Sequence, residues 1–487
     1  MLFIGIDLGT SAVKLLLMDE EGKIHKIVSK EYPLYFPQPG WSEQNPQDWY
    51  AQTIAGLKEL LTDCDKAQVR GIGFGGQMHG LVVLDENDEV IRPAILWNDS
   101  RSWRETGFLN MIIGKDTLSK YTANIAFAGF TAPKILWMKH NEPEKFDRIK
   151  KIMLPKDYLA YRLSGNFCTD YSDASGTLLL DVEYKQWSGD MLEICDVVEE
   201  QLPQIYESWE PVGTLLAPIA RELGLSEDVK IIAGAGDNEA AAVGTATVGA
   251  GKCNISIGTS GTIFMPSEKF RVDENNALHS FVHADGNYHL MGCMLSAASC
   301  NKWWMEGILH TKDYEIEQAN IQKLGENQVF YLPYLMGERS PLNDPDARGA
   351  FIGMTMDTTR EDMTKAVFEG VAFALRDSLE VAKSIGISPE RTNICGGGAR
   401  SPLWRKIIAA VLNMQVDMIE SEEGPGYGAA ILAAVGCGVF PSVEDAANQL
   451  VRIVKTEDPD PELVKKYDRQ YHKFQKIYPA LRNVFSR

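Results

Sequence analysis

The sequence repeats one pattern about half a chain apart, first as Ile6-Asp7-Leu8-Gly9-Thr10-Ser11 and then as Ile255-Ser256-Ile257-Gly258-Thr259-Ser260. Each copy lies between apolar segments typical of β-strands, so each predicts two strands joined by a Gly-Thr-Ser turn. Such a turn leaves backbone N–H groups and hydroxyls pointing outward, where they can bind phosphates. The repeat therefore predicts that two such turns, one in each half of the chain, hold one nucleotide between them, with Thr10, Ser11, Gly258 and Thr259 as phosphate contacts.

The two copies differ at one chemically important position. The first carries a carboxylate at Asp7, where the second carries the neutral Ser256. A carboxylate beside a phosphate turn can order water around Mg²⁺, so we predict that Asp7 handles the metal through water. The alternative is an aspartate that only accepts hydrogen bonds from its own turn, and the second copy favours the functional interpretation.

The length predicts two α/β domains of similar size. A chain of 487 residues exceeds what one hydrophobic core usually supports. The repeat spacing and the glycine content near Val248 predict domains 1–248 and 249–487. In the first, we expect strands at 2–6, 12–18, 23–31 and 69–74 and a helix at 45–61. In the second, we expect a hairpin at 252–265 and helices at 361–385, 402–413 and 427–437.

Charge and composition exclude several partners. The net charge of −19 disfavours nucleic acid and anionic membranes, although backbone N–H groups and Mg²⁺ can still hold a single ATP. Eight cysteines are scattered singly, which favours reduced thiols. No signal peptide or apolar run of membrane-spanning length is evident, so we expect a cytoplasmic protein.

Common nucleotide motifs are also absent. The sequence has no G-x-x-x-x-G-K-[ST], no H-R-D catalytic loop and no complete G-x-G-x-x-G. Nucleotide binding must then depend on the paired turns.

Asp237 is the candidate general base. It follows an apolar run at 229–233 and three residues, Gly234-Ala235-Gly236, and it precedes a helix-like segment. A carboxylate at the carboxyl end of a strand can accept a hydroxyl proton during phosphoryl transfer. The alternative is a plain helix N-cap, and the two roles can coexist.

Polar loops after two strands could bind a small polyol. Gln77, Met78 and His79 follow two glycines that invite close approach, and Trp97 begins a second polar cluster. In that cluster, Asp99 and Arg101 could simply pair at the surface.

Two further segments could contact the nucleotide. Lys14 could approach a phosphate, although a solvated strand edge is the alternative for it. Gly397 and Gly398 lie in a strand, glycine turn and helix start that would admit a purine or ribose. We expect the small-residue helix at 427–435 to pack beneath that turn.

Taken together, these segments resemble the FGGY family of carbohydrate kinases over nearly the whole chain. The matching segments are 5–11, 76–80, 93–99, 129–134, 154–158, 236–238, 256–261, 332–335, 337–339 and 396–400. The resemblance implies the two-domain actin-like, ribonuclease H-like ATPase fold, with ATP and sugar bound in a cleft between the domains.

The resemblance also implies roles for individual residues. Asp237 would be the catalytic base and Asp7 would assist with Mg²⁺ and phosphate. Met78 and His79 would contact the sugar. We add Gln77, Trp97 and Asn238, which lie in matching segments, as further candidates for sugar binding. Thr10, Thr259, Gly397 and Gly398 would contact the nucleotide.

The implied reaction is ATP-dependent phosphorylation of D-xylulose at its terminal hydroxyl, because the Gln77–Gly80 loop matches family members that act on this ketose. Another ketose or a polyol such as glycerol is the alternative substrate, and an ATP-driven chaperone or filament subunit is the alternative class. Related kinases are often dimers, so the resemblance allows a homodimer.

Overall fold

The computed structural model describes residues 1–421 and 423–485. The chain forms two compact units. The first unit contains Met1–Val248, Ser280–Tyr288 and Glu423–Val451, and the second contains the rest of the described residues. Glu423–Val451 thus packs with the N-terminal half although it lies far along the chain. No helix in residues 1–421 or 423–485 has the length and apolar character that a membrane crossing requires.

A seven-stranded mixed sheet forms the centre of the first unit. Its order is β13-β14-β5-β1-β2-β3, and the short β15 also pairs with β5. The bounds are β1 (Leu2–Leu8), β2 (Ala12–Asp19), β3 (Ile24–Glu31), β5 (Val69–Gly76), β13 (Pro211–Thr214), β14 (Lys230–Ile232) and β15 (Ala235–Gly236). β1 and β2 are antiparallel and the Gly9 N–H donates to the Ala12 carbonyl, which confirms the first predicted hairpin.

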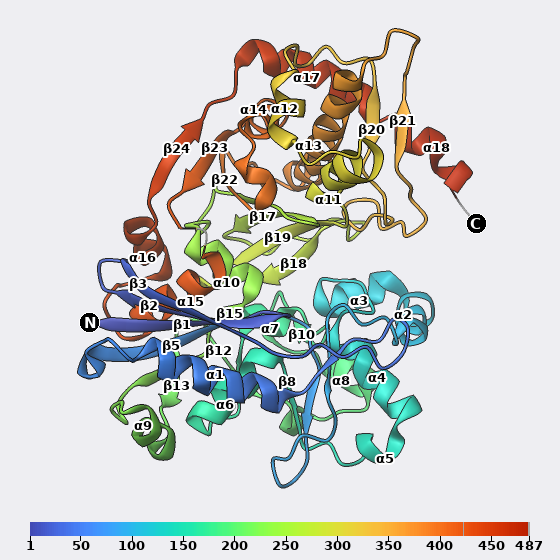
Figure 1. Ribbon diagram of the computed structural model, residues 1–487. Helices are drawn as coiled ribbons and strands as arrows, with labels where there is room; N and C mark the ends of the chain where they lie inside the picture. The colour runs from blue at the N-terminus through green and yellow to red at the C-terminus, as the bar shows by residue number, and fades with distance from the viewer. Residues whose placement is uncertain (422, 486–487) are drawn as a thin grey trace. The chain divides into compact units, whose positions relative to one another are not determined.

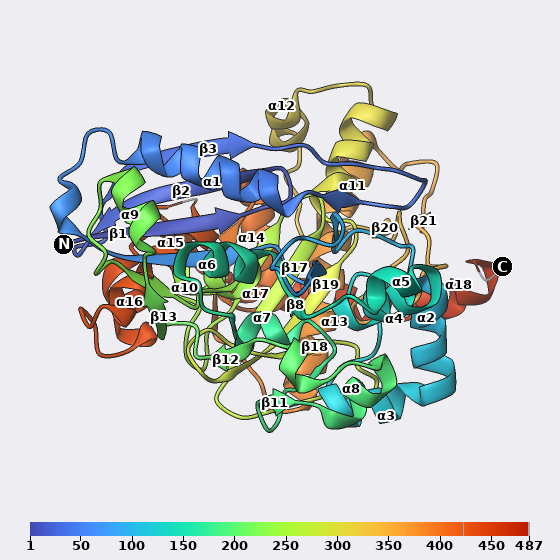
Figure 2. The same cartoon turned by 90° about the horizontal axis from the view of Figure 1, so that it is seen from below.

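Alternation along the strands directs apolar side chains to two faces of this sheet. Ile4, Ile6 and Leu8 share one core with α1 (Pro46–Leu60) and α6 (Pro155–Ser164). Phe3 and Leu16 join the other core, with α10 (Asp237–Gly244), α15 (Gly424–Gly436) and α16 (Val443–Leu450). Figures 1 and 2 show α1 and α6 on one face of these strands, and Figure 1 shows α10 and α15 on the other. The period of two in the strands thus builds a three-layer unit.

Helix α15 approaches the sheet and α10 backbone to backbone. A Cβ atom at Gly5 would lie 1.9 Å from the Gly426 carbonyl oxygen, and one at Gly428 would lie 1.8 Å from the Ala240 carbonyl oxygen. The prediction that this helix packs beneath the Gly396–Gly398 turn is therefore wrong. Its small residues face the glycines of β1 and β5 instead, where the absence of side chains leaves room for the helix backbone.

Three parallel strand ends meet at one edge of the sheet. Leu8 of β1 and Gly236 of β15 are both in register with Gly76 of β5. The next residues along the chain, including Gln77 and Asp237, therefore emerge together at this edge.

The second unit repeats the hairpin. β16 (Asn254–Ile257) and β17 (Gly261–Ser267) are antiparallel, which confirms the predicted hairpin. The strand order continues β19-β17-β16-β22-β23-β24, with β19 (Tyr288–Met294), β22 (Arg391–Cys395), β23 (Gln415–Ile419) and β24 (Ile453–Glu457). α13 (Arg360–Ser384), α14 (Pro402–Leu412) and α17 (Pro461–Phe474) supply much of the remaining core. The three helices predicted for this half of the sequence are observed within a few residues, as α13, α14 and α15.

Candidate active site

Asp237 is the first residue of α10. The N-cap position belongs to Gly236, so the alternative in which Asp237 caps the helix is wrong by one residue. The Asp237 Oδ1 atom accepts from the Asn238 backbone N–H (2.9 Å) and from Asn238 Nδ2 (3.0 Å). Burial raises the pKa of Asp237 to about 6, although these hydrogen bonds favour the charged form. The group is thus ionised at neutral pH, and it is more basic than an ordinary aspartate.

Asp7 lies near Asp237 at the same edge of the sheet. Burial, and next the charge of Asp237, raise the pKa of Asp7 to about 7, while Lys14 lowers it. Mg²⁺ usually keeps several waters and needs only one or two carboxylates, which this pair offers. Within residues 1–421 and 423–485, no group of three or more His, Cys, Asp or Glu side chains could hold a metal ion. The carboxylate pair therefore fits a cation held largely through water.

Gln77 is buried, and neighbouring protein groups bond its side chain. Its Nε2 donates to Gln44 Oε1 (3.0 Å), and its Oε1 accepts from Thr10 Oγ1 (3.4 Å). Gln44 Nε2 in turn donates to the Thr10 carbonyl (2.6 Å), and Trp49 Nε1 donates to Gln44 Oε1 (3.1 Å). These bonds tie the Gln77 loop to the first phosphate turn. Sequence reasoning missed Gln44 and Trp49, which belong to a different segment and no motif.

Met78 and His79 complete this loop. A Cβ atom at Gly236 would lie 3.0 Å from Met78 Sδ, so the thioether covers the bare strand end before Asp237. His79 has a positive φ of 67° and stacks on Phe130 with ring centroids 4.6 Å apart. Its Nδ1 is 2.6 Å from the Gly176 carbonyl oxygen. A carbonyl can only accept, so Nδ1 donates this hydrogen bond, which fixes the orientation of the ring.

The backbone beneath His79 is fixed by a buried lysine. Lys134 Nζ donates to the carbonyl oxygens of His79 (2.8 Å) and Gly129 (2.7 Å), and Thr131 Oγ1 also donates to the His79 carbonyl. The segment at 129–134 matched the family pattern without an evident role. The structure shows that it supports the loop.

The Trp97 segment is divided between the site and the core. Trp97 is exposed, and its Nε1 donates to Thr10 Oγ1 (2.9 Å). Asp99 and Arg101 do pair, but the predicted surface location is wrong because both are buried. Arg101 also lies over the Trp41 ring (3.7 Å to the centroid). These two residues anchor the loop that presents Trp97.

Lys14 is exposed and pairs with Glu423 (2.9 Å). The alternative of a solvated strand edge is thus confirmed as to solvation, but it is wrong as to the edge, because β2 lies between β1 and β3. The proposed contact of Lys14 with phosphate remains a prediction.

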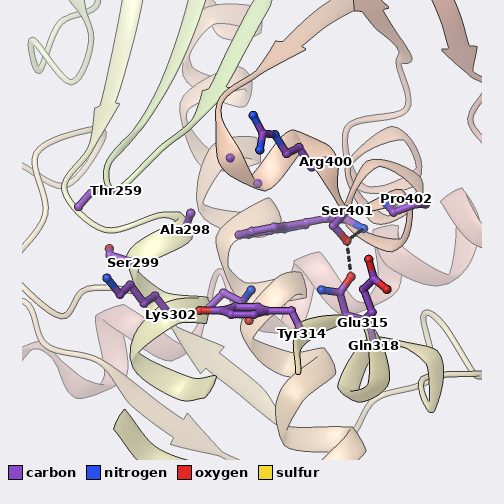
Figure 3. A pocket seen from close by; sticks show the side chains of 14 residues that line it. Thr259, Ala298, Ser299, Lys302, Tyr314, Glu315, Gln318, Arg400, Ser401 and Pro402 are labelled. Carbon is purple, nitrogen blue, oxygen red and sulfur yellow. Dashed lines mark hydrogen bonds between the residues drawn. The ribbon is translucent and has the colours of Figure 1, made fainter. Parts of the chain in front are cut away.

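A cavity of about 500 Å³ lies in the second unit (Figure 3). Its lining includes the predicted Thr259, Gly397 and Gly398, whereas Gly258 is not among the lining residues. Lys302, Tyr314, Gln318, Ser401 and Trp404 also line it, and sequence reasoning missed all five. Tyr314 and Gln318 both lie in α12 (Tyr314–Ala319), a six-residue helix without a recognisable motif.

Ser401 orients the Gln318 amide in this cavity. As N-cap of α14, the Ser401 hydroxyl accepts from the Trp404 backbone N–H (3.1 Å). It donates to Gln318 Oε1 (2.5 Å), as the dashed line in Figure 3 shows. The amide oxygen is thereby engaged by Ser401, which leaves Nε2 as the donor that Gln318 can offer to a ligand. An amide donor, a tyrosine ring and bare glycine backbone are suitable for a purine nucleoside.

The chain resembles known proteins over nearly its whole length. The model of the N-terminal domain of the FGGY family of carbohydrate kinases matches residues 2–244, and that of the C-terminal domain matches residues 253–437. The xylulose kinase of Escherichia coli (strain K12) is 40% identical over 99% of both chains.

Two solved structures resemble the fold equally well. A xylulose kinase from Rhodospirillum rubrum has a TM-score of 0.94 with 27% identity over all of both chains. A gluconate kinase from Lactobacillus acidophilus also has a TM-score of 0.94 with 27% identity, over 99% of both chains. The backbone alone therefore does not decide which sugar is bound.

Proposed function

Because the chain belongs to the FGGY family of carbohydrate kinases, we propose that it transfers the terminal phosphoryl group of ATP to D-xylulose, giving D-xylulose 5-phosphate. The curated relatives from Escherichia coli (strain K12) and Bacillus subtilis (strain 168), at 40% and 39% identity over 99% of this chain, are both named xylulose kinase. We place the reaction in the cytoplasm.

One observation carries the proposal within this chain. The ends of β1, β5 and β15 are in register, so Asp7, the Gln77–His79 loop and Asp237 emerge at one edge of the sheet. Phosphoryl transfer requires a hydroxyl held beside a carboxylate and near phosphate-binding groups. This edge combines those elements in one unit of the fold.

In the proposed mechanism, Asp237 orients the terminal hydroxyl of the sugar and accepts its proton as the phosphorus–oxygen bond forms. With a pKa of about 6, it is ionised at neutral pH and can take up that proton. Asp237 Oδ1 already accepts two hydrogen bonds from Asn238, so the Asn238 side chain fixes the orientation of the carboxylate.

The sugar would lie against Met78, the His79 ring, Trp97 and Asn238. The His79 ring would contact a hydroxyl, and the thioether of Met78 would contact the carbon chain. We assign Gln77 a supporting part, because Gln44 and Thr10 bond its side-chain amide.

The nucleotide would use both phosphate turns. Thr10, Ser11 and Lys14 would contact phosphate from the first turn, and Gly258 and Thr259 from the second. Gly397, Gly398 and the cavity beside Tyr314 would take the nucleoside. Asp7, with Asp237 beside it, would hold hydrated Mg²⁺, which when bound neutralises charge on the transferred phosphoryl group. The raised pKa values of both carboxylates fit a position that a cation would relieve.

The closest rival is another sugar. The equally good fit of a gluconate kinase structure shows that this fold also serves other substrates. The alternative of a chaperone or filament subunit no longer stands, because the family is one of carbohydrate kinases.

A substrate panel tests the proposal. ADP release would be coupled to a reporter reaction for D-xylulose, D-ribulose, D-fructose, D-gluconate and glycerol, with the Asp237→Asn enzyme as the background. We expect D-xylulose to have the highest kcat/KM by at least tenfold. Equal rates across the panel, or a higher value for another compound, would reject D-xylulose as the substrate. Size-exclusion chromatography of the same preparation would decide between a monomer and the homodimer that the family resemblance allows.

A further inference from the structure

A buried charged cluster lies beneath the two strand ends that carry the proposed sugar loop and base. It consists of Lys156, Asp157, Asp170 and Asp173, whose side chains are at most 2% exposed. Lys156 Nζ lies 2.7 Å from Asp157, 2.8 Å from Asp170 and 3.6 Å from Asp173. Asp157 and Asp170 pair with Lys156 and also accept hydrogen bonds, which is how buried charges are usually retained, so the geometry around these two carboxylates is tightly determined.

Lys156 packs directly against the end of β5. A Cβ atom at Gly76 would lie 2.7 Å from the Lys156 Cβ. Gly76 immediately precedes the Gln77–His79 loop. The lysine therefore contacts the strand that presents the proposed sugar loop, while its ammonium group holds Asp170.

Asp170 connects the cluster to the start of α10. Its Oδ2 accepts from the Ser172 N–H (2.8 Å), the Ser172 hydroxyl (2.5 Å) and the Ser208 hydroxyl (2.7 Å). Because the Ser172 hydroxyl donates to Asp170, its lone pairs can accept, and the Gly236 N–H donates to it at 3.2 Å. Gly236 is the residue before Asp237.

The N–H of Gly236, the N-cap residue of α10, donates to a residue that is distant in the sequence. Glycine has no side chain with which to cap the helix, and the Ser172 hydroxyl that accepts from its N–H lies 64 positions earlier. A remote, buried anchor fixes the direction in which the helix begins, and with it the position of the Asp237 carboxylate.

We propose that Ser172 is a positioning residue for phosphoryl transfer, whose hydroxyl is anchored on Asp170 and Lys156 and holds the Gly236 N–H so that Asp237 faces the sugar hydroxyl. This inference rests on the proposed role of Asp237 in a sugar kinase. It adds a residue that touches neither substrate nor nucleotide but controls the alignment of the base.

Ser208 provides a matched control. It is as buried as Ser172 and donates an equivalent hydroxyl to the same Asp170 oxygen, but the Gly236 N–H donates to Ser172 and not to Ser208. Ser172→Ala and Ser208→Ala therefore each remove one hydroxyl from Asp170. Only Ser172→Ala also removes the acceptor of the Gly236 N–H.

The test compares the two variants on the sugar that the wild-type enzyme phosphorylates fastest. This choice separates a failure of the inference from a failure of D-xylulose as the substrate. For Ser172→Ala, we expect kcat to fall at least tenfold, since misplacing a catalytic group by a fraction of an ångström has effects of this order. KM for ATP should stay within twofold. For Ser208→Ala, kcat should stay within twofold while Tm falls, by less than in Ser172→Ala because one hydrogen bond fewer is lost.

Two results would overturn the inference: a kcat for Ser172→Ala within twofold of wild type, or equal losses of kcat in the two variants. If Ser172→Ala does not fold, Ser172→Cys decides the question, because it keeps the packing volume while sulfur accepts hydrogen bonds poorly. A tenfold loss of kcat in folded Ser172→Cys with sugar affinity within threefold by calorimetry would support the positioning role. A wild-type kcat in Ser172→Cys would reject it.

Discussion

Replacing Asp237 by asparagine should have opposite effects on turnover and on stability. The substitution removes the proposed proton acceptor, so kcat should fall by orders of magnitude. The amide oxygen can still accept from the Asn238 N–H, so the sugar should still bind. The same substitution also removes a carboxylate that is buried at an energetic cost.

The size of that cost follows from the pKa of Asp237, which burial raises from an ordinary 3.8 to about 6. A tenfold change in proton affinity corresponds to about 1.4 kcal/mol. At pH 8, where the carboxylate is ionised in both states, its burial therefore costs the folded state about 3 kcal/mol. Since the charge of Asp237 also raises the pKa of Asp7, its removal should relieve Asp7 as well.

The pH dependence of the stability difference distinguishes the loss of a buried charge from a change in packing, because a packing effect would be the same at every pH. The folded state binds the Asp237 proton more tightly than the unfolded state does. The wild-type protein therefore has its full stability from this group below pH 4, where Asp237 is protonated in both states, and loses that stability as the pH rises through 6. The advantage of Asp237→Asn should thus be about 1.5 kcal/mol at pH 5 and about 3 kcal/mol at pH 8. For the wild-type enzyme, kcat/KM should fall about tenfold per pH unit below pH 6, as the base becomes protonated.

Thermal unfolding of both proteins at pH 5 and pH 8 measures the effect. We expect Tm of Asp237→Asn to exceed that of wild type by on the order of 5 °C at pH 8, and by about half of that at pH 5. Asp190→Asn, an exposed carboxylate in the first turn of α8 (Gly189–Cys195), serves as the control and should not raise Tm. A Tm advantage of Asp237→Asn that is absent at pH 8, or equal at both pH values, would refute the reasoning.

Two further predictions concern the second cavity and the core. Gln318→Leu removes the amide donor at similar volume and should raise Kd for ADP about tenfold by calorimetry without changing sugar affinity. Ile316→Ala, at an exposed position on the same helix, is the control and should change neither affinity. An unchanged Kd for ADP in Gln318→Leu would place the nucleoside elsewhere. Gly428→Ala would place a Cβ atom 1.8 Å from the Ala240 carbonyl oxygen. It should therefore lower the free energy of unfolding by on the order of several kcal/mol and Tm by about 10 °C or more. In the control Gly189→Ala, the new Cβ meets no atom within 4 Å and Tm should stay unchanged, whereas a wild-type Tm for Gly428→Ala would contradict the backbone packing of α15.

The local part of this fold could be predicted from sequence because its signals are local. The strands on either side of Gly9 and Gly258 alternate apolar residues around a turn, and both hairpins form as expected. Asp237 could be identified because a strand, two glycines and a helix start stand next to it in the chain. Its position at the strand edge needs no distant partner to be inferred.

Distant partners account for what the sequence could not show. The small residues of α15 indicate close packing, but nothing in that segment says that the chain has returned to the first unit, where Gly5 and Gly73 leave space for it. The buried pairing of Asp99 with Arg101 depends on Trp41, which lies in another loop. Likewise, the partners of Gln77 become evident only when Gln44 is placed beside it.

The tight glycine packing and the buried carboxylates of the first unit have opposite effects on its stability. Asp7 and Asp237 are held at one end of the sheet in surroundings that raise the pKa of each, so their ionisation weakens the folded state. Along the neighbouring face, α15 contacts β1 and α10 without intervening side chains, which maximises dispersion contact and fixes the helix that begins at Asp237. Rigid backbone packing on that face can thus hold a base where its charge is unfavourable. On this argument, a substitution that loosens α15 lowers kcat before it unfolds the chain, because Asp237 loses its alignment first.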